Sequence, residues 1–271
     1  MTQSVAIKTS DEAPATPEAA AAADAAGAAD VGARVARLQG RFPAAPAGVA
    51  GDETLDQKIA ESMAILRAAI AEEFPARIAL VSSFGAEAGI LLHLVSRVAP
   101  DTPVIFLETG KHFAQTLSYR RAVEKQFGLT DVRDVPPPQR DLAAEDPAGD
   151  LWRSDPDRCC EIRKVRPLKD ALAGFDAWIT GRKQFHGGAR MALPTFEASN
   201  GQIKVNPLIR WTPEDIDAYA ARFELPRHPL VAQGFPSIGC WPCTKPASAE
   251  EGVRAGRWRG ADKTECGIHS I

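Results

Sequence analysis

Short apolar segments alternate with helical patterns along the middle of this 271-residue chain, and this alternation restricts the fold more than any other feature. The apolar segments have the length of buried strands, and the stretches between them have apolar residues at helical spacing. The predicted strands are residues 77–81, 104–107, 131–135, 177–180 and 204–208. The predicted helices are residues 55–70, 88–98, 113–127, 161–172 and 213–223. We therefore expect a single α/β domain with a mostly parallel sheet flanked by helices, in which ligands bind beyond the carboxyl ends of the strands.

The two ends of the chain lack this pattern. Residues 1–50 contain 18 alanines and few large apolar side chains, so a helix there would have little to bury. We expect residues 1–51 to form a disordered arm and residues 52–245 to form the folded domain. Residues 246–271 have no hydrophobic period and are expected to form a flexible C-terminal tail.

The composition narrows the classes of protein to consider. A hydrophobic fraction of 45%, a charged fraction of 25% and a net charge of -3 are typical of a soluble globular protein and do not indicate bulk nucleic-acid binding. No apolar run has the length of a membrane span, and the N-terminus has no secretory pattern. The expected location is therefore the reducing cytoplasm, where clustered thiols bind metal more readily than they form disulfides. The oligomeric state stays open, and a homo-oligomer is one option.

The loop after the first predicted strand has the features of an anion site. Ser82, Ser83 and Gly85 stand between that strand and a helix, where free backbone N–H groups and small side chains let a phosphate approach. A serine that merely caps the helix would look the same, and no G-K-[ST] follows, so this is not a Walker loop. Arg182 and Lys183 follow a later strand and would add positive charge at the same edge, unless they are solvated surface residues.

The five cysteines divide into four and one. Cys159 and Cys160 are adjacent, Cys240 and Cys243 form a C-x-x-C pair, and Cys266 stands alone near the C-terminus. Two such pairs present four thiolates to zinc or to an iron–sulfur cluster, and the count does not distinguish the two. Small buried hydrophobic cysteines are the alternative. The lone cysteine is a candidate nucleophile.

Together these residues resemble the assimilatory adenylylsulfate and phosphoadenylylsulfate reductases, which belong to the adenine-nucleotide α-hydrolase-like group. The resemblance extends over about four fifths of the chain, from Leu55 to His269. The segments that carry it are Ser82–Glu87, Glu108–Gly110, Cys159–Val165, Cys240–Cys243, Gly256–Trp258 and Lys263–His269. Members with both cysteine pairs resemble the [4Fe-4S] enzymes that act on adenylylsulfate, whereas the cluster-free members act on the 3′-phosphorylated substrate.

The resemblance implies a role for each of these residues. The cluster would be held by Cys159, Cys160, Cys240 and Cys243, and Cys266 would be the nucleophile. The implied substrate-binding residues are Ser82, Ser83, Phe84, Gly85, Lys164, Arg182, Arg254, Arg257 and His269. Attack of Cys266 on the sulfate sulfur would release AMP and leave an S-sulfocysteine, which thioredoxin or a glutaredoxin-like protein would reduce to give sulfite. Nearby basic residues would lower the pKa of the nucleophile and neutralise the substrate.

Two departures from the family pattern leave alternatives open. Glu108 stands where the family often has aspartate, and Gly181–His186 lacks the usual second arginine and serine. A phosphoadenylylsulfate reductase or a dual-substrate enzyme therefore remains an alternative. Two other classes are an adenylating or tRNA-thiolating relative, which would need a pyrophosphate loop that the sequence lacks, and a non-catalytic nucleotide-binding module with a zinc site of four cysteines.

Overall fold

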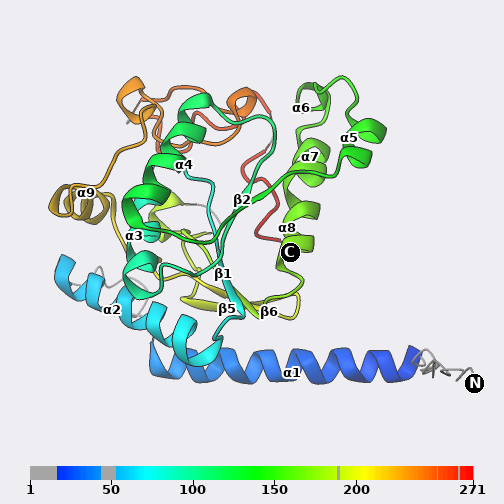
Figure 1. Ribbon diagram of the computed structural model, residues 1–271, viewed down its shortest axis with the longest axis vertical. Coiled ribbons are helices and arrows are strands. Elements are labelled where there is room, and N and C mark those ends of the chain that lie inside the picture. The colour runs from blue at the N-terminus through cyan, green and yellow to red at the C-terminus, as the bar shows by residue number, and fades with distance from the viewer. Residues whose placement is uncertain (1–16, 44–52, 188–189, 249, 262, 271) are drawn as a thin grey trace, which may run out of the picture.

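A six-stranded sheet forms the centre of the molecule (Figure 1). The computed structural model describes residues 17–43, 53–187, 190–248, 250–261 and 263–270, with side chains from residue 29 onward. The strands are β1 (Ile78–Val81), β2 (Val104–Leu107), β3 (Val132–Val135), β4 (Ala177–Ile179), β5 (Phe196–Ser199) and β6 (Gln202–Val205). Their order is β3-β2-β1-β4-β6-β5, and each neighbouring pair is parallel except β5 with β6. The predicted α/β domain with a mostly parallel sheet is confirmed.

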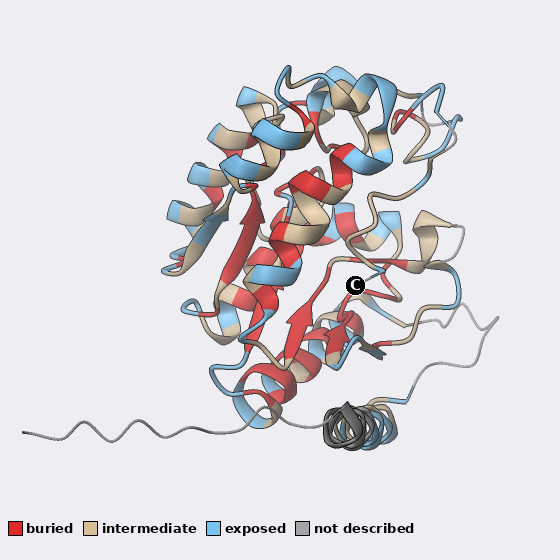
Figure 2. Cartoon of the chain, turned by 90° about the vertical axis from the view of Figure 1, so that its right-hand side faces the viewer, coloured by how far each residue is buried: buried red, intermediate tan, exposed pale blue. Residues whose placement is uncertain are grey.

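Helices cover both faces of this sheet (Figure 2). The α-helices of the described residues are α1 (Pro17–Arg41), α2 (Leu55–Arg67), α3 (Ala88–Val98), α4 (Ala114–Phe127), α5 (Gln139–Glu145), α6 (Leu151–Ser154), α7 (Pro156–Cys160), α8 (Arg166–Leu172) and α9 (Pro213–Arg222). Side chains of β1 alternate between the two faces, because Ile78 and Leu80 belong to one apolar cluster and Ala79 to the other. Burial on both sides explains why β1, β2 and β4 are continuous apolar runs.

The hairpin of β5 and β6 was missed by the sequence analysis, which predicted only a strand at residues 204–208. Asn200 and Gly201 connect the two strands with positive φ angles of 46° and 79°. Asn-Gly is the dipeptide that favours a two-residue hairpin turn, because both residues tolerate the left-handed backbone conformation. This local signal was present in the sequence, and it places β5 at the antiparallel edge of the sheet.

The predicted disordered arm at residues 1–51 requires a correction where the structure describes it. Helix α1 lies along β5 and β6, and Leu38 is 1% exposed in the larger apolar cluster. Val31, Val35 and Phe42 pack against the same cluster, and with Leu38 they follow one another at spacings of four, three and four residues. The stripe is short and stands beside many alanines, so the average composition hid it. Residues 1–16 and 44–52 lie outside the described residues.

The C-terminal tail lies across the carboxyl ends of the strands rather than apart from the domain. Trp258 is buried in it, and Ile268 packs against the apolar cluster that contains Trp178. Its predicted flexibility stays a prediction. In the described part of the chain, no helix is long and apolar enough to cross a membrane.

Candidate active site

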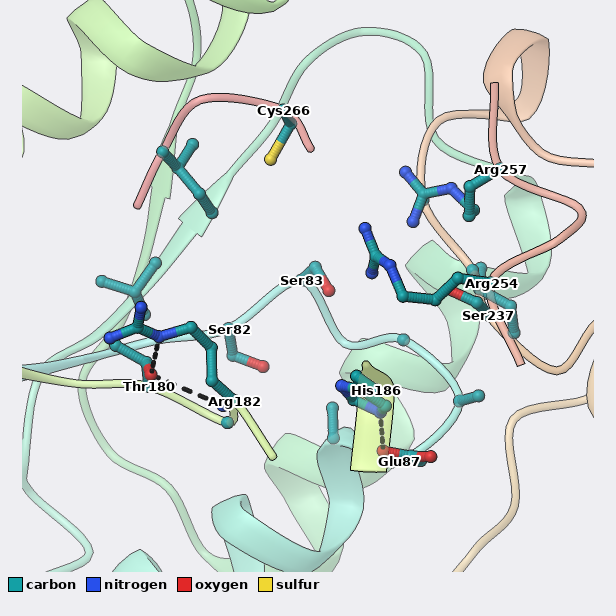
Figure 3. A pocket seen from close by; sticks show the side chains of 18 of the residues that line it. Ser82, Ser83, Glu87, Thr180, Arg182, His186, Ser237, Arg254, Arg257 and Cys266 are labelled. Atoms are coloured by element: carbon teal, nitrogen blue, oxygen red, sulfur yellow. Dashed lines mark hydrogen bonds and ion pairs between the residues drawn. The ribbon is translucent and has the colours of Figure 1, made fainter. Parts of the chain in front are cut away.

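A cavity of about 230 Å³ opens where the central strands end (Figure 3). The loops after β1, β2 and β4 line it from the sheet, and the C-terminal tail lines it from the opposite side. Because parallel strands deliver their carboxyl ends to one edge, segments far apart in the sequence meet here. The cavity therefore lies beyond the carboxyl ends of the strands, where the sequence analysis predicts that ligands bind.

The loop after β1 contributes Ser82, Ser83 and Gly85 to the cavity wall. Gly85 packs against the backbone of Ile238, and an added Cβ would stand 3.1 Å from the Ile238 carbonyl oxygen. The side chain of Phe84 is fully buried in the apolar core and does not line the cavity, and its predicted role in substrate binding stays a prediction. Its φ of 48° turns the ring inward, and its backbone N–H donates to Ser82 Oγ at 3.2 Å.

Three cations reach the cavity from other segments. Arg254 and Arg257 extend into it from the tail (Figure 3), and Lys164 comes from the short π-helical turn Glu161–Val165. The Arg257 guanidinium lies 4.4 Å from the centre of the Trp258 ring, and within the described part of the chain its buried Nε has no hydrogen-bond partner. Burial disfavours the charge on Lys164, yet the neighbouring thiols of Cys240, Cys266 and Cys160, whose thiolate forms attract the ammonium group, raise its pKa above the ordinary value. The cavity is therefore suited to a multiply charged anion.

Arg182 and Lys183 also lie at this edge, but each is buried against a carboxylate. The Arg182 guanidinium pairs with Glu197 and donates from Nε to Thr180 Oγ1 at 3.3 Å. Lys183 Nζ stands 2.8 Å from Glu87 Oε2. Both residues line the cavity, so the alternative of solvated surface residues is wrong. Their charges are already balanced within the protein.

His269 lines the cavity from the end of the tail. Its ring lies parallel to that of Trp178 with centres 5.8 Å apart, and Lys204 Nζ donates to its carbonyl oxygen at 2.6 Å. Burial, reinforced by nearby cations, lowers its pKa well below the ordinary value, so the imidazole is neutral. Its Nδ1 atom is buried and has no hydrogen-bond partner among the residues that the structure describes.

Cys266 places its sulfur toward the same cavity (Figure 3). The residue is partly exposed and is a free thiol. It also lines a second cleft, together with Asp157, Glu161 and Lys263. The single cysteine that the sequence singled out thus stands beside three predicted anion-binding cations.

The other four cysteines come from two segments near Lys164. Cys159 and Cys160 end α7, while Cys240 and Cys243 flank a short 3-10 turn, and all four are free thiols. Burial raises the pKa of Cys159 to about 11 and that of Cys160 to about 12, and the charge of Cys240 acts on both in the same direction. Among the residues that the structure describes, no three His, Cys, Asp or Glu side chains are arranged around one position for a metal ion. The predicted metal role stays a prediction.

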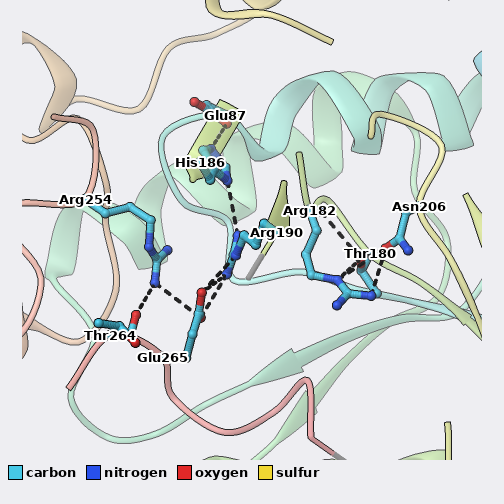
Figure 4. A network of polar contacts seen from close by, with 9 residues as sticks. All are labelled: Glu87, Thr180, Arg182, His186, Arg190, Asn206, Arg254, Thr264 and Glu265. Carbon is cyan, nitrogen blue, oxygen red and sulfur yellow. Dashed lines mark hydrogen bonds and ion pairs between the residues drawn. The ribbon is translucent and has the colours of Figure 1, made fainter. Parts of the chain in front are cut away.

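Sequence reasoning missed four polar residues that connect the loop after β1 to the tail (Figure 4). They are Glu87, His186, Arg190 and Glu265. Glu87 and Glu265 stand inside two of the motifs that indicated the family, which was the only available signal. His186 ends the segment Gly181–His186, which departs from the family pattern, and Arg190 stands in no motif, because the contacts of both residues join segments far apart in the sequence.

The fold and this site define an adenine-nucleotide α-hydrolase-like protein with a thiol in its cavity. The structure is similar to the FMN adenylyltransferase of Candida glabrata, with a TM-score of 0.51 and coverage of 81% of this chain and 74% of that one. The sequence identity is 14%, so this likeness shows the fold alone.

Residues 77–246 match the phosphoadenosine phosphosulfate reductase domain, and the chain belongs to this family. It is 49% identical to the adenosine 5′-phosphosulfate reductase of Mesorhizobium japonicum, over 76% of this chain and 81% of that protein. It is 42% identical to adenosine 5′-phosphosulfate reductase 1 of Bacillus subtilis, over 69% and 82%. The phosphoadenylyl-sulfate reductase of Candida auris, solved with phosphate, has a TM-score of 0.58 and 27% identity, and the match covers 72% of this chain and 98% of that one.

Proposed function

We propose that this chain is an adenylylsulfate reductase, which reduces adenylylsulfate to sulfite and AMP in sulfate assimilation. The observation that carries the proposal is the Cys266 thiol in one cavity with Lys164, Arg254 and Arg257. Relatives that are 49% identical to this chain bear the name of this activity. A nucleophile surrounded by cations fits a substrate in which a sulfate is joined to a nucleotide phosphate.

The first half of the reaction follows from this arrangement. The Cys266 thiolate attacks the sulfur of the sulfate group and forms an S–S bond. The bond from that sulfur to the bridging oxygen breaks, and its electron pair leaves with the phosphate of AMP. Arg254 and Arg257 offer planar donors for the phosphosulfate oxygens, and they stabilise the charge that develops on the leaving phosphate. The product on the enzyme is an S-sulfocysteine.

The second half needs a dithiol reductant, and we assign this role to thioredoxin or a glutaredoxin-like protein. One of its thiolates attacks the Cys266 sulfur, sulfite leaves with the electron pair of the S–S bond, and a mixed disulfide remains. The second thiol of the reductant then releases Cys266 as a thiolate, so the dithiol supplies both electrons. Cys266 is partly exposed and lines a second cleft, which supports access by such a partner.

A [4Fe-4S] cluster held by Cys159, Cys160, Cys240 and Cys243 is part of the proposal. The donor set supports it, since four free cysteines in two neighbouring segments offer the thiolates that such a cluster needs. Lys164 and Arg163 lie near these thiols, and their positive charge would offset the net negative charge of a thiolate-bound cluster. When bound, the cluster would supply an electrostatic influence on the cavity through Lys164. A zinc ion is the alternative, and iron, sulfide and zinc analysis of anaerobically purified protein distinguishes the two.

Anaerobic incubation with adenylylsulfate, without any thiol reductant, tests the proposed reaction. Peptide mass spectrometry should find an added SO₃ on Cys266 together with one equivalent of AMP. Repeating the incubation with phosphoadenylylsulfate measures the preference between the two substrates. The Cys266→Ser variant should form no adduct and lose turnover by at least about 10³-fold, while it still binds nucleotide. Sulfite production at the parent rate in this variant would refute the assignment of the nucleophile.

A further inference from the structure

The residue that precedes the nucleophile is held by two arginines (Figure 4). Arg190 makes a two-pronged contact with the Glu265 carboxylate, from Nε to Oε1 at 2.8 Å and from Nη2 to Oε2 at 2.9 Å. The Nη2 atom of Arg254 lies 3.3 Å from Oε2 of the same carboxylate and donates to the carbonyl oxygen of Thr264 at 2.9 Å. Such a fork fixes both the position and the orientation of the carboxylate.

We propose that the Arg190–Glu265 pair is the clamp that positions Cys266 in the cavity, so that both are positioning residues for the reaction. The proposal rests on the proposed function of Cys266 as the nucleophile. Glu265 and Cys266 are neighbours in the C-terminal tail. Contacts between this tail and the domain determine where the tail lies in the cavity. A fixed carboxylate one residue away therefore restricts where the thiol can lie.

Arg190 is itself held by the folded domain. Its side chain is 12% exposed, and its Nη1 atom donates to His186 Nδ1 at 3.1 Å. His186 Nε2 in turn lies 3.2 Å from Glu87 Oε2, in the loop that follows β1. These contacts agree with one neutral tautomer, in which Nδ1 accepts and Nε2 donates. The clamp is thus anchored to the same loop that lines the substrate cavity.

The clamp also reduces the repulsion between the Glu265 carboxylate and an anionic substrate. Glu265 would repel an anionic substrate if its carboxylate stood alone near the cavity. Pairing with Arg190 neutralises it, and Arg254 can then turn to the substrate without releasing the tail. Arg190 is accordingly the partner that holds the tail in both the free and the substrate-bound state, whereas Arg254 is shared.

The rate at which iodoacetamide alkylates Cys266 in the substrate-free protein tests this clamp. Peptide mass spectrometry separates Cys266 from the other cysteines. In both the Glu265→Gln and the Arg190→Gln variants, we expect alkylation to accelerate by about 5-fold or more, the factor that corresponds to ~1 kcal/mol. The direction is diagnostic, because loss of a positive charge alone would raise the pKa of a nearby thiol and slow alkylation in Arg190→Gln.

A double variant and a matched control complete the test. Both single substitutions break the Arg190–Glu265 pair, and Glu265→Gln also removes the Arg254 contact, so the double variant should react no faster than Glu265→Gln alone. Glu251→Gln removes a comparable pair in the same tail, since Glu251 lies 2.8 Å from Arg259, and it should leave the alkylation rate unchanged. Slower alkylation in Arg190→Gln, or additive effects in the double variant, would overturn the proposal.

A second readout links the clamp to the reaction. In a single turnover with adenylylsulfate, both variants should form S-sulfocysteine at least about 5-fold more slowly than the parent protein, and Glu265→Asp should recover part of the rate. The alkylation assay contains no substrate, so its result stands even if the parent protein forms no S-sulfocysteine. That combination would refute the proposed function and retain the clamp.

Discussion

At the scale of single residues, one carboxylate organises the charged groups beside the cavity. Glu87 stands 2.8 Å from Lys183 Nζ and 3.2 Å from His186 Nε2. Burial alone would raise its pKa, but the charge of Lys183 and the contacts with His186 outweigh burial and lower the pKa to about 2. Glu87 is therefore ionised at all physiological pH values, and its charge is matched inside the protein.

This low pKa predicts how stability depends on pH. The carboxyl of glutamate in the unfolded chain has a pKa near ~4.3, so ionised Glu87 stabilises the fold above that value, and this stabilisation is lost as the pH falls toward 2. Glu87→Gln should lower the free energy of unfolding by about 1–3 kcal/mol at pH 7, and by less as the pH falls below ~4.3. Urea denaturation at several pH values measures the difference. Glu72→Gln, in the exposed pair with Arg41, is the control, and a deficit independent of pH would contradict the prediction.

At the scale of elements, backbone pairing attaches the tail to the segment of Cys240 and Cys243. The Lys245 N–H donates to the Gly256 carbonyl at 2.8 Å, and the Trp258 N–H donates to the Cys243 carbonyl at 3.0 Å. Gly256 is required by this close approach, since an added Cβ would stand 2.1 Å from the Lys245 carbonyl oxygen. These backbone hydrogen bonds position Arg257 at the cavity, and they lie next to the segment that contains Cys240 and Cys243.

Gly256→Ala should disturb that pairing while the sheet stays intact. The new methyl group meets backbone atoms that cannot rotate away, and overpacking of this kind costs about 1–3 kcal/mol. We expect adenylylsulfate reduction to lose about 5- to 100-fold in kcat/KM, because Arg257 moves with the tail. Limited trypsin digestion should also cut the tail faster. Gly174→Ala, where an added Cβ meets nothing within 4 Å, is the control, and equal kinetics in the two variants would argue against this role.

At the scale of the whole molecule, α1 extends the core beyond the α/β unit. Leu38 is buried in the main apolar cluster, and Gln39 Nε2 donates to the Phe196 carbonyl of β5 at 2.9 Å. The helix therefore packs along the antiparallel edge of the sheet and shields it from solvent. The N-terminal segment is part of the stability of the domain, although it lies far from the cavity.

Substitutions in α1 test this packing. Leu38→Ala should lower the free energy of unfolding by about 2–4 kcal/mol, since it removes a buried side chain and leaves a cavity. Arg37→Ala on the exposed face, next to Leu38 in sequence, should change it by less than about 1 kcal/mol. Chemical denaturation measures both values. If both substitutions changed the free energy of unfolding by equal, negligible amounts, the segment would be part of the disordered arm that the composition predicts.

Features that depend on residues close together in the sequence could be predicted, and they include most of the strands and the cysteine pairs. Continuous apolar runs identified the central strands β1, β2 and β4, because a strand buried on both faces has no polar side to alternate with. The two cysteine pairs and Cys266 were visible because thiols at these spacings are rare and chemically specific. The cavity at the carboxyl edge followed from the predicted parallel arrangement of the strands, since parallel strands bring their loops to one side.

The tertiary structure decided what depends on contacts between distant segments. Phe84 had the sequence position of a cavity residue, but its left-handed backbone turns the ring into the core. The contact of Arg190 with Glu265 joins residues 75 positions apart, which no local pattern can indicate. By itself, the sequence determined the class of fold and the reactive groups, because these follow from local periodicity and residue chemistry. Only packing in three dimensions determined which charges meet, which are neutralised and how the nucleophile is held.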